Sequence, residues 1–308
     1  MKLVFAGTPL PAVPSLEALI NSDHEVAAVI TRQDAELGRK RVLTPSPVAV
    51  VAAANGIPLI KANRLDDTAT EAVRALQPDL GVIVAYGGLV REPLLSVPRL
   101  GWINLHFSLL PRWRGAAPVQ HAVIAGEQET GAAVFQLVPA LDAGPVFGMI
   151  HERIGADQTA GELLESLGVS GAELLVRVVD QLADGTARSL EQVGEVTLAP
   201  KLGLADARID WTQPADAVYQ RVRGVTPEPG AFTMLGDTRL KLLEMARTTG
   251  DDSLPAGVIR LVDGEVQIGT ATRPLELVTV QPAGKKPMRA TDWWRGLATE
   301  ATEEVVAS

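Results

Sequence analysis

The first half of the chain alternates between short runs of apolar residues and longer stretches in which apolar residues recur with helical spacing. Alternation of strand and helix patterns is typical of a mostly parallel sheet with helices on both faces. The predicted strands are residues 3–6, 25–31, 58–61, 80–85 and 102–106, and the predicted helices are residues 12–21, 47–55, 68–76 and 117–125. The pattern therefore indicates an α/β fold for this half.

Three further elements follow before the alternation ends. Residues 130–138 and 146–153 are predicted to be strands, and an antiparallel pair is one arrangement open to them. Residues 159–183 show a long helical pattern that ends at an Asp-Gly pair. Gly168 and Gly171 lie inside this pattern, so a break or kink is open there.

The periodicity fades between residues 186 and 205, and a different pattern follows. After a helix predicted over residues 216–224, turn signals separate five short predicted strands, at residues 231–235, 238–246, 256–261, 265–269 and 274–280. Short strands at this spacing favour a small β-barrel, for which the oligonucleotide-binding type is one option. We therefore expect three parts, residues 1–185 as the larger domain, 186–205 as a linker and 206–308 as the barrel.

Composition narrows the class of protein. With 308 residues, two domains are favoured over one, and 46% hydrophobic with 21% charged residues is typical of a soluble globular protein. The absence of Cys excludes disulfides, iron–sulfur clusters and thiolate zinc sites, and the four His have no metal-like spacing, so no metal is expected. No signal peptide is recognised, and no apolar run approaches the roughly 20 residues of a membrane span. We expect a cytoplasmic protein with no membrane contact, and take a monomer as the default.

The charge distribution bears on possible partners. A formal net charge of −9 argues against nucleic acid as a partner unless a local basic patch supplies the contact. The clearest patch is Arg39, Lys40 and Arg41, in a loop before a proline-rich turn. A charged loop is most often simply solvated. The length and position of this loop, after the second predicted strand, favour a flexible arm near the mouth of a site.

The richest candidate for chemistry is the stretch INLHFSLLPRWRGAAP, residues 103–118. Asn104 and His106 are two residues apart on a predicted strand, so both side chains point to one face, at the edge of the sheet where ligands bind. A histidine that is hydrogen-bonded inside the core is the simpler interpretation. Burying two polar side chains is costly, however, and is expected mainly where they are needed for function. Asp142, in LDAGP, could orient the imidazole, although spacing alone does not show that it reaches His106 and Asp is also a common turn residue. An amide, an imidazole and a carboxylate together suggest chemistry on a carbonyl carbon.

Several segments, in order along the chain, resemble signatures of the methionyl-tRNA formyltransferases. They are VFAGTP with AVPSLEAL, GRKRVLTPSPV, VIVAYG, INLHFSLLPRWRGAAPVQ, LDAGP, ADARIDW, PEPGAFT and VQPAGKKPM. The resemblance runs nearly from end to end. It implies a Rossmann-like N-terminal formyltransferase domain and a smaller C-terminal barrel like the oligonucleotide-binding fold. It also implies 10-formyltetrahydrofolate as formyl donor and initiator methionyl-tRNA as acceptor, for translation initiation.

The resemblance also implies residue roles. The catalytic residues fall on Asn104, His106 and Asp142. The folate-contacting SLLP falls on Ser108, Leu109, Leu110 and Pro111, and the tRNA-probing arginine falls on Arg39, with Lys40 and Arg41 beside it. The chain departs from the usual family pattern at Leu10-Pro11, Lys40, Ala143 and Glu228, which affects the fine shape of the site and the tRNA contacts.

These roles lead to a hypothesis for the mechanism. The free amine of methionine attacks the formyl carbon on folate N10, and Asn104 and a protonated His106 donate hydrogen bonds to the oxyanion. Asp142 would hold His106 in its charged form and help to move the proton from the amine to the leaving nitrogen.

Three other functions share part of the pattern. A sugar-nucleotide formyltransferase would use the same three residues and folate but a UDP- or dTDP-amino sugar as acceptor. A formyltetrahydrofolate hydrolase domain would release formate without an acceptor. A non-catalytic nucleotide- or RNA-binding protein would use only the sheet edge and barrel, and would have no need for Asn104 and His106 on one strand face.

Overall fold

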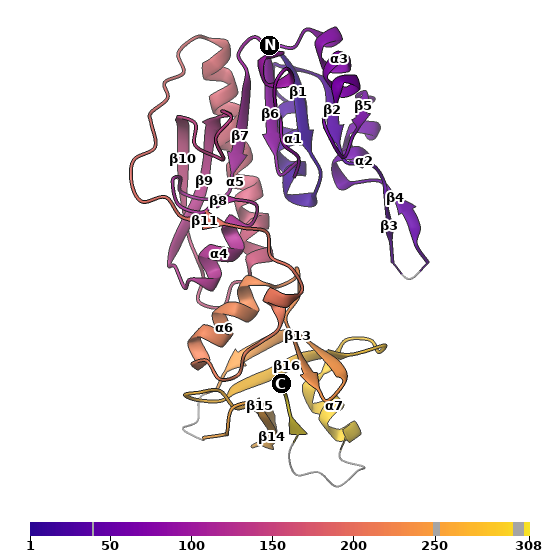
Figure 1. The fold of residues 1–308 in the computed structure, drawn as a ribbon, viewed down its shortest axis with the longest axis vertical. Helices are drawn as coiled ribbons and strands as arrows, with labels where there is room; N and C mark the ends of the chain where they lie inside the picture. Colours follow the sequence, from indigo (N-terminus) through magenta and orange to yellow (C-terminus); the bar gives the residue numbers. More distant parts are fainter. Residues whose placement is uncertain (39, 249–252, 298–304) are drawn as a thin grey trace. The chain divides into compact units, whose positions relative to one another are not determined.

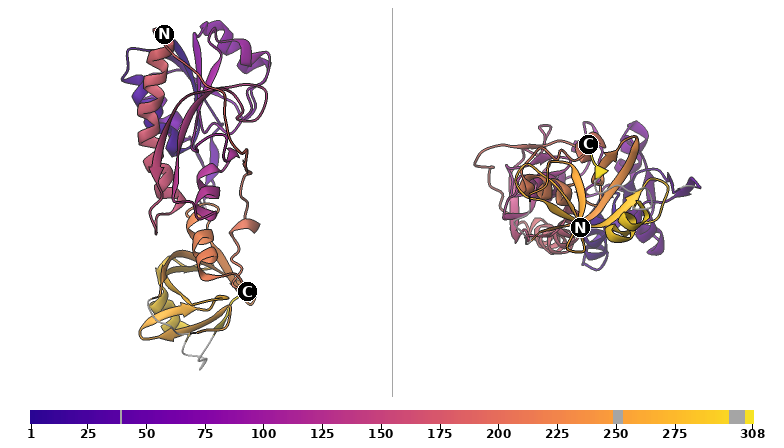
Figure 2. Two further views of the ribbon diagram at one scale, coloured as in Figure 1. Left: turned by 90° about the vertical axis from the view of Figure 1, so that its left-hand side faces the viewer. Right: turned by 90° about the horizontal axis from the view of Figure 1, so that it is seen from below.

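The computed structural model describes residues 1–38, 40–248, 253–297 and 305–308. The chain divides into two compact units (Figures 1 and 2). The first, which we call the N-terminal unit, comprises Met1–Pro118, Glu129–Arg153 and Leu164–Ala199. The second, the C-terminal unit, comprises Val119–Gln128, Ile154–Leu163 and Pro200–Ser308. Each unit is described separately below.

The N-terminal unit is built on a seven-stranded sheet with the order β10-β9-β7-β6-β1-β2-β5. Five strands are parallel: β1 (Lys2–Gly7), β2 (Glu25–Thr31), β5 (Leu59–Lys61), β6 (Leu80–Val84) and β7 (Trp102–His106). β9 (Glu129–Gln136) pairs antiparallel with β7, and β10 (Val146–Arg153) pairs antiparallel with β9. The expected α/β class with a mostly parallel sheet is confirmed, and the two later strands do form an antiparallel pair.

Helices accompany the sheet at the positions that the periodicity predicts. They are α1 (Val13–Ile20), preceded by the 3-10 turn η1 (Leu10–Ala12), α2 (Pro47–Ala54), α3 (Asp67–Leu76) and α5 (Ala160–Ala183), with a second 3-10 turn, η2 (Leu94–Ser96). The helix α4 (Pro118–Ile124) also forms where the periodicity predicts it, but nearly all of it belongs to the C-terminal unit. The Ser46 hydroxyl accepts from the Ala49 amide at the start of α2, and the Asp66 carboxylate accepts from the Ala69 amide at the start of α3. These side chains satisfy amides that a helix N-terminus leaves unpaired.

The long helix α5 continues through both of its internal glycines (Figure 2). A Cβ at Gly168 would lie 3.1 Å from the Pro11 carbonyl oxygen, and a Cβ at Gly171 would lie 3.0 Å from the Leu105 side chain. The glycines therefore permit close packing against the N-terminal unit, which explains why they do not break the helix there.

Short strands occur where the sequence predicts only loops. β3 (Ala35–Leu37) and β4 (Val42–Thr44) form an antiparallel hairpin that projects from the body of the N-terminal unit (Figure 1). β8 (Arg114–Gly115) pairs in parallel with β11 (Leu198–Ala199). The second pair ties part of the expected linker to the N-terminal unit.

The C-terminal unit is an antiparallel barrel. Its sheet has the order β12-β13-β16-β15-β14-β18, and β17 pairs with β16. The backbone of Ser308, just after β18, exchanges hydrogen bonds of 2.9 and 3.0 Å with Met234 on β12, which brings the two ends of the sheet together. The strands are β12 (Phe232–Leu235), β13 (Thr238–Arg247), β14 (Val258–Val262), β15 (Glu265–Ile268), β16 (Leu275–Pro282), β17 (Met288–Arg289) and β18 (Val305–Val306).

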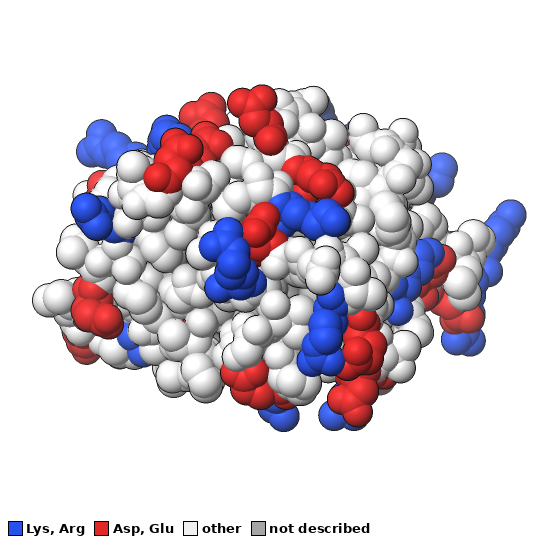
Figure 3. All heavy atoms as spheres, turned by 90° about the horizontal axis from the view of Figure 1, so that it is seen from above, with Lys and Arg blue, Asp and Glu red and all other residues white. Residues whose placement is uncertain are grey.

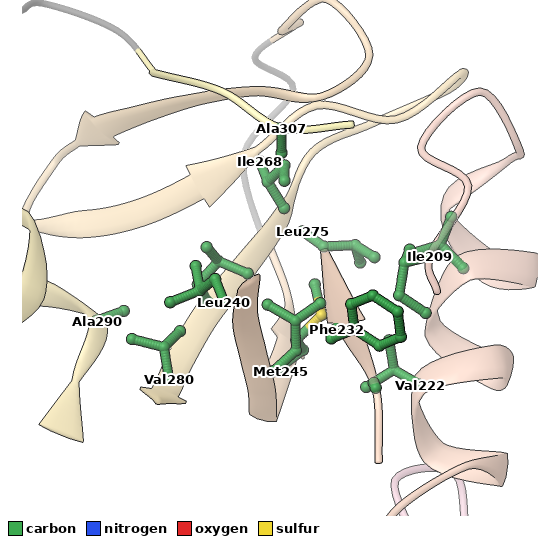
Figure 4. Packing of buried hydrophobic residues seen from close by; sticks show 14 of the residues in the cluster. Ile209, Val222, Phe232, Leu240, Met245, Ile268, Leu275, Val280, Ala290 and Ala307 are labelled. Atoms are coloured by element: carbon green, nitrogen blue, oxygen red, sulfur yellow. The ribbon is translucent and has the colours of Figure 1, made fainter. Parts of the chain in front are cut away.

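The core of the C-terminal unit lies between the barrel and its helices. The helical elements are η3 (Ala205–Ala207), α6 (Ala215–Gly224) and α7 (Ala290–Leu297), of which the sequence predicted only α6. Figure 4 shows the Phe232 ring of β12 directed toward Val222 of α6, with Met245 and Leu275 beside it. Trp293 and Trp294 of α7 are buried in the same cluster. Trp residues bury a large apolar area, which explains why this unpredicted helix is held to the barrel.

Two surface properties bear on function. On the face drawn in Figure 3, acidic and basic side chains are interspersed, and neither sign forms a continuous patch. Among the described residues, no helix is both long enough and apolar enough to cross a membrane.

Candidate active site

The end of β7 carries the first two candidate residues. β7 lies between β6 and β9, with Asn104 opposite Ile83 and Phe135 in the register of its neighbours. Asn104 is half-buried, and within the described part of the chain its amide makes no hydrogen bond. His106 is buried, with 5% of its surface exposed. The strand thus offers a free amide donor beside an enclosed imidazole.

Two contacts fix the His106 ring. Its Nε2 donates a hydrogen bond of 2.9 Å to the Trp113 carbonyl oxygen. A carbonyl can only accept, so this contact assigns the ring proton to Nε2 in the neutral form and leaves Nδ1 with a lone pair. The His106 and Phe135 rings pack in a T-shaped arrangement, with 6.3 Å between their centroids.

Asp142 approaches the free side of the same ring. Its Oδ2 lies 3.8 Å from His106 Nδ1 and accepts a hydrogen bond of 2.7 Å from the Gly115 amide. The Asp142 side chain is 12% exposed. The structure thus brings together two side chains 36 positions apart, a contact that sequence spacing left open.

The loops around this pair hold unusual backbone conformations. Asp142 has a φ of 43° and Trp113 a φ of 59°, both in the left-handed region that non-glycine residues rarely adopt. Each such residue costs on the order of 1–3 kcal/mol and persists only where its surroundings hold it. Both residues face His106, so the strain lies at the candidate site.

Burial decides the charge of His106. Desolvation lowers the pKa of the imidazole below its ordinary value of 6.5, and outweighs the Asp142 carboxylate and the Trp113 hydrogen bond, which both raise it. The ring is therefore neutral near pH 7 in the free protein. The expectation that Asp142 keeps a resting His106 charged is corrected, because one carboxylate does not offset the loss of water around a buried ring.

The SLLP segment begins one residue after the end of β7, beyond Phe107. The buried Ser108 hydroxyl donates a hydrogen bond of 2.6 Å to the Arg112 carbonyl oxygen. Leu110 belongs to a buried cluster with Ala133 and Phe135, whereas Leu109 is only partly buried. Pro111 is buried. Leu109 is therefore the most exposed residue of this segment.

The basic residues lie on a different element. Arg39 is outside the described residues. Lys40 and Arg41 are exposed in the β3–β4 hairpin, and Arg41 Nε lies 2.5 Å from Glu36 Oε2. No hydrogen bond or ion pair of the described residues joins this hairpin to Asn104, His106 or Asp142.

Four residues around the site escaped the sequence interpretation. Trp113 and Gly115 contact His106 and Asp142 through backbone atoms, so no side-chain motif signals them. Gln192 and Thr197 lie in the expected linker, yet Gln192 Nε2 donates to the Asp142 carbonyl oxygen at 2.7 Å and Thr197 Oγ1 accepts from the Trp113 amide at 2.9 Å. In the described residues, no cluster of three or more His, Cys, Asp or Glu side chains forms a metal-binding group.

Family models match both parts of this chain. One described as "Formyl transferase" matches residues 1–179, and one described as "Formyl transferase, C-terminal domain" matches residues 201–298. Together with an amide, an imidazole and a carboxylate at the end of a central strand, these matches define the class as the formyl transferases.

Close relatives narrow this class. The methionyl-tRNA formyltransferase of Leifsonia xyli subsp. xyli is 64% identical to the chain, over 98% of this chain and 99% of that protein. The methionyl-tRNA formyltransferase of Clavibacter sepedonicus is 60% identical, over 97% of this chain and 98% of that protein. The chain belongs to the methionyl-tRNA formyltransferase family, as the resemblance in the sequence indicated.

A solved structure adds evidence for the fold. The N-formyltransferase from Helicobacter canadensis, in complex with folinic acid and dTDP-3-aminofucose, superposes with a TM-score of 0.69. It is 16% identical in sequence and covers 90% of this chain and 98% of that one. At this identity the likeness establishes the shared fold, and leaves the choice of acceptor to the much closer relatives.

Proposed function

We propose that this protein transfers the formyl group of 10-formyltetrahydrofolate to the amino group of methionine on initiator methionyl-tRNA. The observation that carries the proposal is identity of 60–64% over nearly the whole length to two proteins named for that reaction. The convergence of His106 and Asp142, on the strand face that also carries Asn104, supplies a suitable site. The reaction would serve translation initiation in the cytoplasm.

The chemistry begins with attack of the methionine amine on the formyl carbon attached to folate N10. A tetrahedral intermediate forms, and its oxygen becomes negatively charged. The half-buried Asn104 amide, which has no competing partner among the described residues, donates to this oxyanion. A preorganised donor in a site that excludes water stabilises the transition state more than water would.

His106 acts as the proton carrier in this proposal. Its neutral ring presents the Nδ1 lone pair, because Nε2–H is engaged by the Trp113 carbonyl. Nδ1 accepts the proton from the attacking nitrogen, and the imidazolium that forms faces the Asp142 carboxylate at 3.8 Å. The proton then passes to N10 as the carbon–nitrogen bond to folate breaks. The products are a formamide on the methionine nitrogen and tetrahydrofolate with N10–H, and no step uses a metal.

The substrates would contact different elements. The SLLP segment, Ser108–Pro111, would form one wall of the folate pocket, with Leu109 against the ring system. Arg39, Lys40 and Arg41 of the β3–β4 hairpin would contact the tRNA acceptor stem, and the barrel would follow the tRNA backbone. Residues 1–185 would then bind folate and carry the chemistry, residues 206–308 would bind tRNA, and the protein would act as a monomer.

A formyl-transfer assay with several acceptors tests this proposal. The purified protein is incubated with 10-formyltetrahydrofolate and either initiator methionyl-tRNA, elongator methionyl-tRNA or a dTDP-amino sugar. We expect rapid formylation of the initiator substrate only. Formylation of the sugar nucleotide, formate release without an acceptor, or folate binding without turnover would instead support one of the three alternative functions.

A further inference from the structure

A segment beyond α5 runs alongside the candidate site, and we call residues 190–199 the return segment. At its start, Leu190 exchanges two backbone hydrogen bonds with Val146, of 2.8 and 2.9 Å. At its end, β11 pairs with β8, and the Ala199 carbonyl accepts from the amides of Ala116 and Ala117. The return segment is therefore fixed to the N-terminal unit at both ends, although it has little regular structure.

Gln192 uses both ends of its amide to connect two loops. Its Nε2 donates to the carbonyl oxygens of Asp142 and Gly144, at 2.7 and 2.9 Å. Its Oε1 accepts two hydrogen bonds from the Arg114 guanidinium, at 3.1 Å from Nε and 2.6 Å from Nη2. One side chain thus links the loop of Asp142 to the turn at residues 113–115.

The turn at residues 113–115 contacts both His106 and Asp142. The Trp113 carbonyl accepts from His106 Nε2, and the Gly115 amide donates to Asp142 Oδ2. Thr197 supports the turn, because its hydroxyl accepts from the Trp113 amide and its carbonyl accepts from the Arg114 amide, both at 2.9 Å.

We propose that Gln192 is a positioning residue for formyl transfer, which holds the Asp142 carboxylate against His106 by clamping the Asp142 loop to the 113–115 turn, with Thr197 in support. Asp142 and Trp113 both have left-handed backbones that unrestrained residues would leave. Gln192 binds the backbone carbonyl of Asp142 and the side chain of Arg114, which is the neighbour of Trp113. The proposal rests on the function proposed above.

Variants at Gln192 separate its two contacts. Gln192→Leu removes all four hydrogen bonds. Gln192→Glu keeps an acceptor for Arg114 but loses the donor to the Asp142 and Gly144 carbonyls. We expect both variants to lower kcat on the order of 100-fold, because a displacement of about 1 Å at a reacting group has an effect of this size. KM for 10-formyltetrahydrofolate and for methionyl-tRNA should stay near the wild-type values, since Gln192 touches neither substrate in the proposed mechanism.

Glu191→Gln is the matched control for both variants, because Glu191 is adjacent to Gln192 and exposed. The kcat of this control variant should be unchanged.

A second pair of variants remains informative if Gln192→Leu fails to fold. Thr197→Val removes the hydroxyl that accepts from Trp113 N, whereas Thr197→Ser retains it. We expect Thr197→Val to reduce kcat and Thr197→Ser to restore most of it. Equal activity of the two would contradict the support assigned to Thr197.

The pKa of His106 provides a readout that general destabilisation would not move. NMR titration of the His106 ring follows this pKa in the wild type and in each variant. If Gln192→Leu, which adds no charge, releases the Asp142 loop, the Asp142 carboxylate raises the imidazole pKa less, and the titration of His106 should move to lower pH. An unchanged His106 titration together with wild-type kcat in Gln192→Leu would overturn the proposal.

The outcomes also distinguish this proposal from the function on which it rests. A wild-type protein that does not formylate methionyl-tRNA would refute the proposed function, and the NMR titration would still test the clamp. A wild-type protein that formylates normally, with Gln192→Leu and Gln192→Glu equally active, would refute the positioning role alone.

Discussion

At the scale of single residues, the proposed site combines the Asn104 amide, which has no hydrogen-bond partner among the described residues, with the buried ring of His106. Asn104 and His106 were placed together by strand periodicity, because residues two apart on a strand share a face. The charge of His106 was not predictable, since it depends on how much water the folded chain removes from the ring. Burial lowers the pKa of His106 despite the Asp142 carboxylate, so the imidazole is neutral near pH 7 and has a lone pair for the proton transfer that we propose.

Removal of the Asn104 amide tests its role as oxyanion donor. We expect Asn104→Ala to reduce kcat on the order of 100- to 1,000-fold, the usual effect of losing one such donor. The dissociation constant for folate, measured by titration, should change far less, because the oxyanion exists only after attack. Turnover equal to that of the wild type would remove Asn104 from this role.

Asp142→Asn tests the electrostatics of the pair. The Asp142 carboxylate raises the pKa of His106, whereas burial lowers it. Without the carboxylate, the pKa of His106 should therefore fall further below 6.5. In the wild type the unfolded chain binds more protons than the folded chain between pH 6.5 and the lowered pKa of folded His106. The contribution of His106 to the free energy of unfolding is therefore complete above pH 6.5, and it is lost as the pH falls through the lowered pKa of the folded protein.

NMR titration measures the pKa directly, and it avoids the titration of the acceptor amine that would complicate rate measurements. In Asp142→Asn, the pH window of destabilisation should extend to lower pH, as followed by urea unfolding at a series of pH values. A rise in the pKa of His106 in this variant would contradict the account.

At the scale of elements, the central strands depend on close contacts that apolar patterns do not specify. Trp102 on β7 is fully buried, lies opposite Gly81 on β6, and donates from Nε1 to the Leu94 carbonyl at 2.9 Å. A Cβ at Gly81 would lie 2.2 Å from the Trp102 ring, so only glycine leaves room for the indole. This contact fixes the strand that carries Asn104 and His106.

Gly81→Ala should therefore destabilise the N-terminal unit. Overpacking a buried position typically costs about 1–3 kcal/mol, and the backbone of β6 cannot move without disturbing its pairs with β1 and β7. Chemical unfolding should show the loss. Gly203→Ala is a suitable control, because Gly203 is exposed and an added Cβ would come no closer than 3.8 Å to its nearest neighbour, the Asp206 carboxylate. Equal stability of both variants and the wild type would show that β6 and β7 adjust more freely than this packing indicates.

At the scale of the whole molecule, the net charge of −9 means that the proposed tRNA binding must depend on local cations. The β3–β4 hairpin carries Lys40 and Arg41 away from the body of the N-terminal unit, and Arg41 is paired with Glu36. An exposed ion pair of this kind contributes little to stability, so Arg41 can exchange Glu36 for a phosphate at small cost.

Neutralising the hairpin should weaken tRNA binding and leave folate binding intact. For Lys40→Gln combined with Arg41→Gln, the slope of log affinity against log salt should become shallower by about 0.9 for each phosphate that the variant no longer neutralises. Glu36→Gln removes the competing acidic partner and serves as the opposite control, with affinity equal to or tighter than wild type. If the double variant keeps both the affinity and the salt slope, the hairpin does not contact phosphate.

Sequence patterns alone were enough to predict the order of the main elements, the mostly parallel sheet, the strand bearing Asn104 and His106, and the family. These features depend on local periodicity and on contiguous motifs, which need no folded structure to be recognised. The same patterns indicated Asp142, but only as a residue type in a turn. The β3–β4 strands and the pairing of β8 with β11 were missed, because such short strands carry little periodicity. The helix α7 was missed as well, although it is as long as α1 and α2, which were predicted.

Contacts between distant residues became visible only in the folded chain. The 3.8 Å approach of Asp142 to His106, the proton on Nε2 and the lowered pKa of the ring all arise from packing and loss of water. Gln192 is the clearest case, because in sequence it lies in a stretch without periodicity, whereas in the fold it binds residues 48 and 50 positions earlier. No local pattern encodes such a contact, because it exists only once two separate loops have been brought together.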